Sequence, residues 1–203
     1  MSKTYFISDT HFGHANLVRL ARTEFSDIVR HDMTIRQNWR DTVGKDDEVW
    51  MLGDFAYRCG YALEPLLRDL PGHKHLVMGN HDHTWIKQNP KALEQFESVQ
   101  QMAEIDLNGL HLFLCHYPMV EWNMSRHGSI LIHGHIHNNT DHPFWPLMAK
   151  TPTMLNASVD INHWKPVTLG ELVKNNEDFK KNHLINHPRG RAPGFGGSLT
   201  LID

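Results

Sequence analysis

Short runs of apolar residues that stop abruptly at Asp, Gly, Cys or His recur along the chain. The clearest are Thr4–Ser8, Glu48–Leu52, His75–Met78, Leu110–Leu114 and Ser129–Ile132. Apolar runs of about 4–8 residues bounded by turn residues are typical of buried β-strands. Weaker patterns predict three more strands, near Glu104–Leu107, Met154–Val159 and Pro166–Leu169.

Apolar residues at helical spacing separate several of these runs. The expected helices are Asn16–Arg22, Met33–Val43, Tyr61–Leu70 and Pro90–Gln101, with a further helix beginning near Thr84. Strands that alternate with helices predict an α/β domain. Sheets of this kind place ligand sites beyond the carboxyl ends of their strands, so the residues after each strand are the first place to look for chemistry.

Chemically active side chains follow all five of the clearest runs. The strand ends read Asp9-Thr10-His11, Gly53-Asp54, Gly79-Asn80-His81-Asp82, Cys115-His116 and His133-Gly134-His135-Ile136-His137. Each group is ordinary by itself, because Asp and Asn are common at helix caps and in turns. Their occurrence after every one of these strands indicates a shared site, since separate accidents would otherwise be needed at each.

The ordered pattern D-x-H, G-D, G-N-H-D, H and G-H-x-H resembles that of the calcineurin-like metallophosphoesterase superfamily, over residues 9–137. The stretches SDTHFGHAN, NWRDTVGKDDEVWMLGDFAY, LPGHKHLVMGNHD, HYPM and HGHIH are similar to a short bacterial and phage-type subgroup. The resemblance implies a four-layer α-β-β-α sandwich of two mixed β-sheets. We expect this domain to cover residues 1–187, followed by a Gly/Pro-rich C-terminal tail over residues 188–203.

The resemblance also implies two divalent metal ions and their ligands. The implied set is one bridging carboxylate, Asp54, and two groups of three: Asp9, His11 and His137 for one ion, and Asn80, His116 and His135 for the other. A carboxylate has two oxygens and can bridge. On a straight strand His135 and His137 would share one face, so that each could reach one ion. Oxygen and imidazole ligands without a thiolate favour Mn²⁺, with Fe, Zn²⁺, Ni²⁺ or Mg²⁺ as alternatives.

By the same resemblance, the reaction is hydrolysis of a phosphate ester. Hydroxide held between the two ions would attack phosphorus, and the ions would stabilise both the attacking and the leaving oxygen. His81 is the implied catalytic residue, a general acid for the leaving group. An asparagine at position 80 leaves the centre with a net positive charge, which attracts an anionic ester.

Four further residues are candidate substrate contacts: His14, Arg58, Trp122 and His127. His14 follows His11 by three positions, and a solvated histidine at a helix start is its alternative. Arg58 stands where protein Ser/Thr phosphatases carry a phosphate-binding arginine, but Tyr57 replaces their acidic residue, which argues against that activity. In the loop after His116, an aromatic ring can stack on a base or simply anchor the loop.

These residues favour a phosphodiesterase that acts on nucleotide-like substrates or nucleic-acid ends. A phosphomonoesterase acting on a small metabolite or nucleotide is the alternative within the same chemistry. A non-catalytic binding scaffold is an alternative from another class, and it predicts decayed ligands. All seven implied ligands and His81 are present, which argues against the scaffold.

Composition limits the remaining classes. The chain has 203 residues, 17 His, two Cys and a formal net charge of −3, so it fits one domain without a disulfide framework. No signal-peptide pattern precedes the first apolar run, so a cytoplasmic location is expected. No apolar stretch approaches the roughly 18–20 residues that span a bilayer, and no membrane association is expected. A charge near zero argues against broad binding of nucleic acid but allows local recognition of an end.

Overall fold

The computed structural model describes residues 2–184, and the expected tail over residues 188–203 lies outside the described residues. The first sheet has the order β4-β3-β2-β1-β9 and is built from β1 (Thr4–Ile7), β2 (Glu48–Met51), β3 (His73–Val77), β4 (Ser98–Gln100) and β9 (Val167–Thr168). The second has the order β5-β6-β7-β8 and is built from β5 (Met102–Leu107), β6 (Leu110–Cys115), β7 (Ile130–His133) and β8 (Met154–Asn156). Each sheet is parallel except for one antiparallel edge pair, β1 with β9 and β5 with β6.

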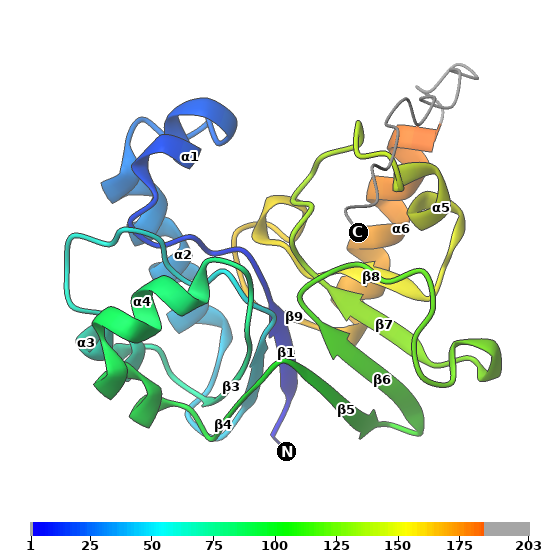
Figure 1. The fold of residues 1–203 in the computed structure, drawn as a ribbon, viewed down its shortest axis with the longest axis horizontal. Helices are drawn as coiled ribbons and strands as arrows, with labels where there is room; N and C mark the ends of the chain where they lie inside the picture. The colour runs from blue at the N-terminus through cyan, green and yellow to red at the C-terminus, as the bar shows by residue number, and fades with distance from the viewer. Residues whose placement is uncertain (1, 185–203) are drawn as a thin grey trace, which may run out of the picture.

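Helices cover the outer face of each sheet (Figure 1). Those beside the first sheet are α1 (Ala15–Ala21), α2 (Ile28–Thr42), α3 (Leu63–Asp69) and α4 (Asp82–Gln88). Those beside the second sheet are α5 (Trp145–Lys150) and α6 (Leu169–Leu184). Short 3₁₀ helices are η1 (Pro90–Gln95), η2 (Ser125–His127) and η3 (Val159–Ile161).

Alternate residues of each strand point into different apolar layers. In β1, Tyr5 and Ile7 pack with Trp39 of α2, whereas Phe6 packs between the sheets with Leu114 of β6. On the far side of the second sheet, residues such as Phe113 pack with the α5 side chains. Three apolar clusters thus separate four layers. The expected α-β-β-α sandwich of two mixed sheets is confirmed.

The expected helix over Pro90–Gln101 is wrong in its second half. The segment begins as η1 but ends in β4, which pairs in parallel with β3 through His75↔Ser98 and Val77↔Gln100. The open edge of β3 offers backbone hydrogen bonds that only an extended strand can satisfy, and this tertiary pairing overrides the local helical pattern.

The sequence pattern also does not predict α5 or α6. The expected strand over Pro166–Leu169 is the short β9, and the chain turns at Leu169 directly into the 16 residues of α6. The buried side of α6 includes Asn176 beside Leu172, and Asn176 donates to the Asn156 carbonyl oxygen at 3.0 Å. A polar residue on the buried face hides the apolar periodicity by which a helix is recognised.

No helix in residues 2–184 combines the length and apolar character needed to cross a membrane.

The buried face of α6 leads to a stability prediction. Leu172 is fully buried in the cluster of Phe6 and Leu114, because α6 packs against β9 and β1 of the first sheet as well as β8 of the second. Leu172→Ala removes apolar contacts and leaves a cavity, so we expect the free energy of unfolding to fall by about 2–5 kcal/mol. Urea unfolding measures this change, with the exposed Glu177→Ala on the same helix as the control. Equal midpoints for the two variants would show that α6 does not contribute to the core.

Candidate metal centre

The polar ends of five strands meet at one edge of the sandwich. β1, β2 and β3 are parallel neighbours in the first sheet, and β6 and β7 are parallel neighbours in the second, so their carboxyl ends lie side by side. Ser8 links the sheets at this edge, because its N–H donates to the Ala157 carbonyl oxygen at 2.9 Å and its carbonyl oxygen accepts from Val159 N–H at 3.1 Å. Loops from both sheets therefore contribute to a single site.

Asp54 lies at the centre of this site. It is 2% exposed, and its Oδ2 is 3.6 Å from Nε2 of His11 and 3.6 Å from Nε2 of His116. Its other oxygen, Oδ1, accepts from the backbone N–H of His81 at 2.9 Å. One carboxylate oxygen thus faces imidazoles from two different loops, as a bridging ligand requires.

The fully buried Asp9 lies beside Asp54. Its carboxylate accepts from His135 N–H at 3.1 Å, and its Oδ1 lies 3.9 Å from Nε2 of His137. The ligand atoms of Asp9, His11 and His137 all lie within 4.8 Å of one another. The same holds for Asp9, Asp54 and His116.

Asn80 brings the remaining candidates together. Its Oδ1 lies 3.1 Å from Nε2 of His116 and 3.0 Å from Nδ1 of His135. Asn80 is exposed to solvent, whereas His116 is fully buried. The structure therefore brings together all seven residues implied as ligands from the sequence.

Two of the histidines, His116 and His11, have a ring nitrogen available to bind a cation. Nδ1 of His116 lies 2.7 Å from the Leu52 carbonyl oxygen, which only accepts, so Nδ1 carries the proton and Nε2 presents its lone pair to Asp54. Nε2 of His11 is buried and, within the described residues, has no hydrogen-bond partner. Buried polar atoms normally have a hydrogen-bond partner. A buried imidazole nitrogen that has none and lies beside a carboxylate is therefore typical of a metal ligand.

The electrostatics of the site point the same way. Burial raises the pKa of Asp54 to about 6, against the opposing effect of His116, and the Asp9 carboxylate adds to the increase. Burial also lowers the pKa of His11 well below its usual value, and that of His135 in the same direction. Although burial acts to lower it, the pKa of His137 is raised instead, because the charge of Asp9 and the hydrogen bond to Asp160 outweigh the effect of burial. Imidazoles around two carboxylates form a donor set that suits a divalent transition metal.

Several of these residues have a left-handed backbone, which is uncommon outside glycine. Positive φ angles occur at Asp9 (56°), His11 (49°), Asp54 (54°), His135 (74°) and His137 (51°). Such conformations are strained, and they cluster at functional sites.

The expectation that His135 and His137 share a strand face is wrong, because β7 ends at His133 and both residues lie in the following turn. Both side chains still face the site, His135 toward Asn80 and His137 toward Asp9.

Gly134 shows how closely the two sheets approach. A Cβ atom at this position would overlap the Ser8 hydroxyl oxygen and lie 2.6 Å from Oδ2 of Asp9. Any other residue here would push the loop after β7 away from the end of β1. The glycine is therefore required for ligand candidates of the two sheets to meet.

Asp82 holds two of the ligand loops and has no role assigned from the sequence. Its Oδ2 accepts from the N–H groups of Asp54 (2.9 Å) and Gly79 (2.7 Å). Its Oδ1 accepts from Phe55 N–H (2.9 Å) and from the indole N–H of Trp85 (2.6 Å). One buried carboxylate thus fixes the loop after β2 against the loop after β3. Its position in the G-N-H-D motif is the sequence signal by which Asp82 could have been recognised as part of the site.

Arg22 and Asp160 are also absent from the sequence-based site. Oδ2 of Asp160 accepts from Nδ1 of His137 at 2.9 Å and from Nη2 of Arg22 at 2.8 Å. Although burial acts to raise it, the pKa of Asp160 is far below its usual range, because the hydrogen bond from His137 and the charge of Arg22 stabilise the carboxylate. Asp160 follows the expected strand Met154–Val159, so the search of strand ends could have found it. No sequence signal marks Arg22.

The candidate substrate contacts lie in different surroundings. Nδ1 of His14 is 3.2 Å from Nδ1 of His11, so His14 touches a ligand candidate directly. Arg58 is exposed, and its guanidinium lies 5.2 Å from the ring centre of Tyr57. His127 is exposed in η2. Their contact with substrate stays a prediction.

Trp122 does not line the site as an open aromatic ring. It is 8% exposed, packs in the apolar cluster outside the second sheet, and donates from Nε1 to the Ser129 hydroxyl at 2.9 Å. It anchors the loop, because its large apolar surface is more stable in the core than in water. Tyr117 is the aromatic ring of this loop that lies beside the site, 45% exposed and with its centre 4.7 Å from that of His135.

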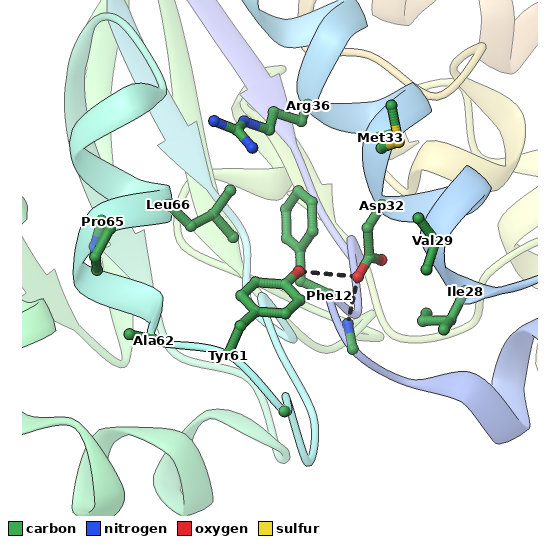
Figure 2. Close-up of a pocket in the computed structure, with 12 residues that line it drawn as sticks. Phe12, Ile28, Val29, Asp32, Met33, Arg36, Tyr61, Ala62, Pro65 and Leu66 are labelled. Atoms are coloured by element: carbon green, nitrogen blue, oxygen red, sulfur yellow. Dashed lines mark hydrogen bonds between the residues drawn. The ribbon is translucent and has the colours of Figure 1, made fainter.

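Two cavities border the site loops. One of about 530 Å³ lies between α1 and the loop after β7, and its lining includes Leu17, His135, His137 and Asn138. The other, of about 720 Å³, lies between α2 and α3, where Tyr61 points toward Asp32 and the two side chains form a hydrogen bond (Figure 2). The lining of the first cavity includes two ligand candidates, whereas that of the second includes none.

The sequence pattern that describes the calcineurin-like phosphoesterase superfamily domain matches residues 3–143. The chain belongs to this superfamily. It is also 31% identical to the Gene 66 protein of Mycobacterium phage L5, over 92% of this chain and 96% of the phage protein. An uncharacterized protein of Methanocaldococcus jannaschii is 34% identical, over 92% of this chain and 98% of the archaeal protein.

A solved structure is also similar to this chain. The crystal structure of a protein of unknown function from Aquifex aeolicus is similar with a TM-score of 0.66 and 29% identity, and it covers 86% of this chain and 99% of that protein. Membership of the calcineurin-like phosphoesterase superfamily makes the protein a metal-dependent phosphoesterase. The residues grouped at the strand ends include candidates for binding that metal.

The contacts of Asp82 predict a large effect of a small change in this phosphoesterase. In Asp82→Asn the amide nitrogen would face two N–H donors in place of an acceptor. Leaving buried donors unsatisfied lowers the free energy of unfolding by about 2–5 kcal/mol. Chemical denaturation of the metal-free protein measures the loss, with the exposed Asp178→Asn as a matched control. Unchanged stability in Asp82→Asn would mean that its hydrogen bonds do not hold the two loops.

Proposed function

We propose that the protein is a binuclear metal-dependent phosphodiesterase. Asp54 would bridge the two ions. Asp9, His11 and His137 would complete one set of ligands, and Asn80, His116 and His135 would complete the other. The observation that carries this proposal is the position of Asp54 Oδ2, 3.6 Å from a nitrogen of each set. When bound, two divalent ions activate a water molecule and neutralise the charge of the phosphate. Mn²⁺ is the proposed metal, because the ligands are oxygen and imidazole groups without a thiolate.

His81 is the proposed general acid. Its Nε2 lies 3.9 Å from Oδ2 of Asp54, and its side chain is 33% exposed, so it borders the centre while remaining open to a substrate. The backbone N–H of His81 donates to Oδ1 of Asp54, and this hydrogen bond fixes the position of the His81 backbone beside the centre. A proton donated from this ring to the departing oxygen lowers the barrier for breaking the ester bond.

The cavity of about 530 Å³ beside His135 and His137 supports a diester substrate. A phosphodiester carries two organic groups, and a site for it needs room on both sides of phosphorus. A cavity of this size accommodates a nucleoside-sized group, and the exposed Tyr117 ring beside His135 offers a surface for stacking a base. Nucleotide-like molecules and nucleic-acid ends are therefore the proposed substrates, with His14, Arg58 and His127 as proposed contacts.

We also propose a cytoplasmic location, which the two free cysteines among the described residues support.

An assay on a panel of esters tests the reaction. Metal-free protein supplied with Mn²⁺ should hydrolyse bis-p-nitrophenyl phosphate with a higher kcat/KM than p-nitrophenyl phosphate, and EDTA should abolish both activities. Cyclic nucleotides and nucleic-acid ends are assayed alongside to find the natural class. Preference for the monoester would favour a phosphomonoesterase, and failure on every ester would favour a binding scaffold.

Replacement of His81 separates catalysis from metal binding. His81→Ala should retain both metal ions by elemental analysis, while turnover falls by about 10²–10⁴-fold because the leaving group loses its proton donor. The control is His83→Ala, an exposed histidine two positions further along. If His81→Ala loses its metal, the residue is a ligand and the proposed acid role is wrong.

A further inference from the structure

A buried arginine joins two loops that carry ligand candidates. Arg22 is the residue that follows the last residue of α1, and its side chain is fully buried. Its Nη2 donates to the Asp9 carbonyl oxygen at 2.6 Å, and its Nη1 donates to the Thr10 carbonyl oxygen at 3.2 Å. Nε and Nη2 also donate to the two carboxylate oxygens of Asp160, at 3.0 and 2.8 Å. The guanidinium therefore holds the backbone of Asp9 and the side chain of Asp160 at the same time.

Asp160 determines which nitrogen of His137 carries a proton. Nδ1 of His137 lies 2.9 Å from Oδ2 of Asp160. Nη2 of Arg22 lies 3.3 Å from the same Nδ1, but its two hydrogens are directed to the Asp9 carbonyl oxygen and to Oδ2 of Asp160, at 2.6 and 2.8 Å. A carboxylate paired with arginine only accepts hydrogen bonds, so Nδ1 of His137 carries a proton and donates it to Asp160. In the neutral imidazole the lone pair is then on Nε2, which lies 3.9 Å from Oδ1 of Asp9. His137 is thus held in the tautomer that presents a lone pair toward the carboxylates.

We propose that Arg22 and Asp160 are positioning residues that preset the metal centre before any metal binds. Asp160 orients His137, and Arg22 orients both Asp160 and the backbone of Asp9. This inference rests on the proposed function, because it takes His137 and Asp9 as ligands. Residues that hydrogen-bond to a ligand in this way raise metal affinity without touching the ion.

The network continues into α2 and fixes a second part of the site. Nη1 of Arg22 lies 2.8 Å from Nε2 of His31, and since a guanidinium only donates, His31 accepts there. Nδ1 of His31 then donates to Oδ1 of Asp32 at 2.8 Å. Oδ2 of Asp32 accepts from the backbone N–H of Gly13 at 3.0 Å, two residues after His11. Arg22 therefore supports the segments around both Asp9 and His11.

The geometry requires arginine and not merely a positive charge. The donors of Arg22 are spread over a plane and reach Asp9, Thr10, Asp160 and His31 together. A lysine ammonium is a compact point charge and cannot span these acceptors. Arg22→Lys consequently keeps the charge while losing most of the positioning, which makes it a conservative test of the proposal.

The first measurement is the affinity for Mn²⁺, by isothermal titration calorimetry on metal-free protein. We expect the Kd to rise about 10–100-fold in Asp160→Asn and in Arg22→Lys. Asp69→Asn is the control, because Asp69 pairs with Arg36 on the outer helices and contacts none of the ligand candidates. Its Kd should equal that of the wild-type protein.

The second measurement is the tautomer of His137, by NMR of metal-free protein labelled with ¹⁵N-histidine. At a pH at which His137 is neutral, wild-type protein should show its proton on Nδ1, and Asp160→Asn should show a mixture of tautomers. If Asp160→Asn does not fold, the double variant Arg22→Met/Asp160→Asn replaces it, because that variant leaves no buried charge unpaired. A role confined to stability would lower the unfolding temperature without changing the Kd or the tautomer.

The outcomes separate this proposal from the function on which it rests. Wild-type protein that binds no metal would overturn the proposed centre itself. Wild-type protein that binds Mn²⁺ with the same Kd as folded Asp160→Asn would overturn only the positioning role. A wild-type His137 protonated on Nε2 would also overturn it, because the lone pair would then face Asp160.

Discussion

Two buried carboxylates, Asp9 and Asp54, lie side by side, and no lysine or arginine in residues 2–184 forms an ion pair with either of them. Their side-chain partners at ion-pair distance are histidines: His137 for Asp9, and His11, His81 and His116 for Asp54. Burying a negative charge without compensation is unfavourable by several kcal/mol. Backbone N–H groups from His135 and His81 reduce this penalty but do not remove it. The arrangement is therefore most stable with cations between the strand ends, and the surrounding loops are built to keep the lone pairs turned toward that position.

Much of this could be predicted from the sequence because the underlying signals are local. Each strand next to the site is a short apolar run, and the residue types that follow it, such as Asp54 after Gly53, are those that bind metals. Parallel strands necessarily bring their carboxyl ends to one edge, so the convergence of these residues follows from the α/β pattern. The ordered motifs then indicate the family, and with it the sandwich that the structure contains.

The rest depends on contacts between distant segments, which a local pattern does not contain. β4 forms because the edge of β3 needs a partner, and α6 buries Asn176 among apolar residues because that amide satisfies the Asn156 carbonyl oxygen. The left-handed backbone at His135 and His137 reflects the close approach of the two sheets at Gly134. Arg22 lies 138 positions from its partner Asp160, so neither residue reveals the other along the chain. Residues that support a site are harder to recognise than residues that form it, since their role depends on partners that are distant along the chain.

The hydrogen bonds of Ser8 have a consequence for how the molecule can move. The Ser8 backbone pairs with the segment after β8 while its hydroxyl donates to the Leu52 carbonyl oxygen at 2.8 Å, so one residue joins β1, β2 and the second sheet. These bonds join the two halves of the sandwich directly beside Asp9, so separation of the sheets at the site would have to break them. The part of the site that solvent reaches is the rim at Asn80 and His81, whose side chain is 33% exposed. Approach of a phosphate ester through this rim leaves the hydrogen bonds of Ser8 intact and requires no separation of the sheets.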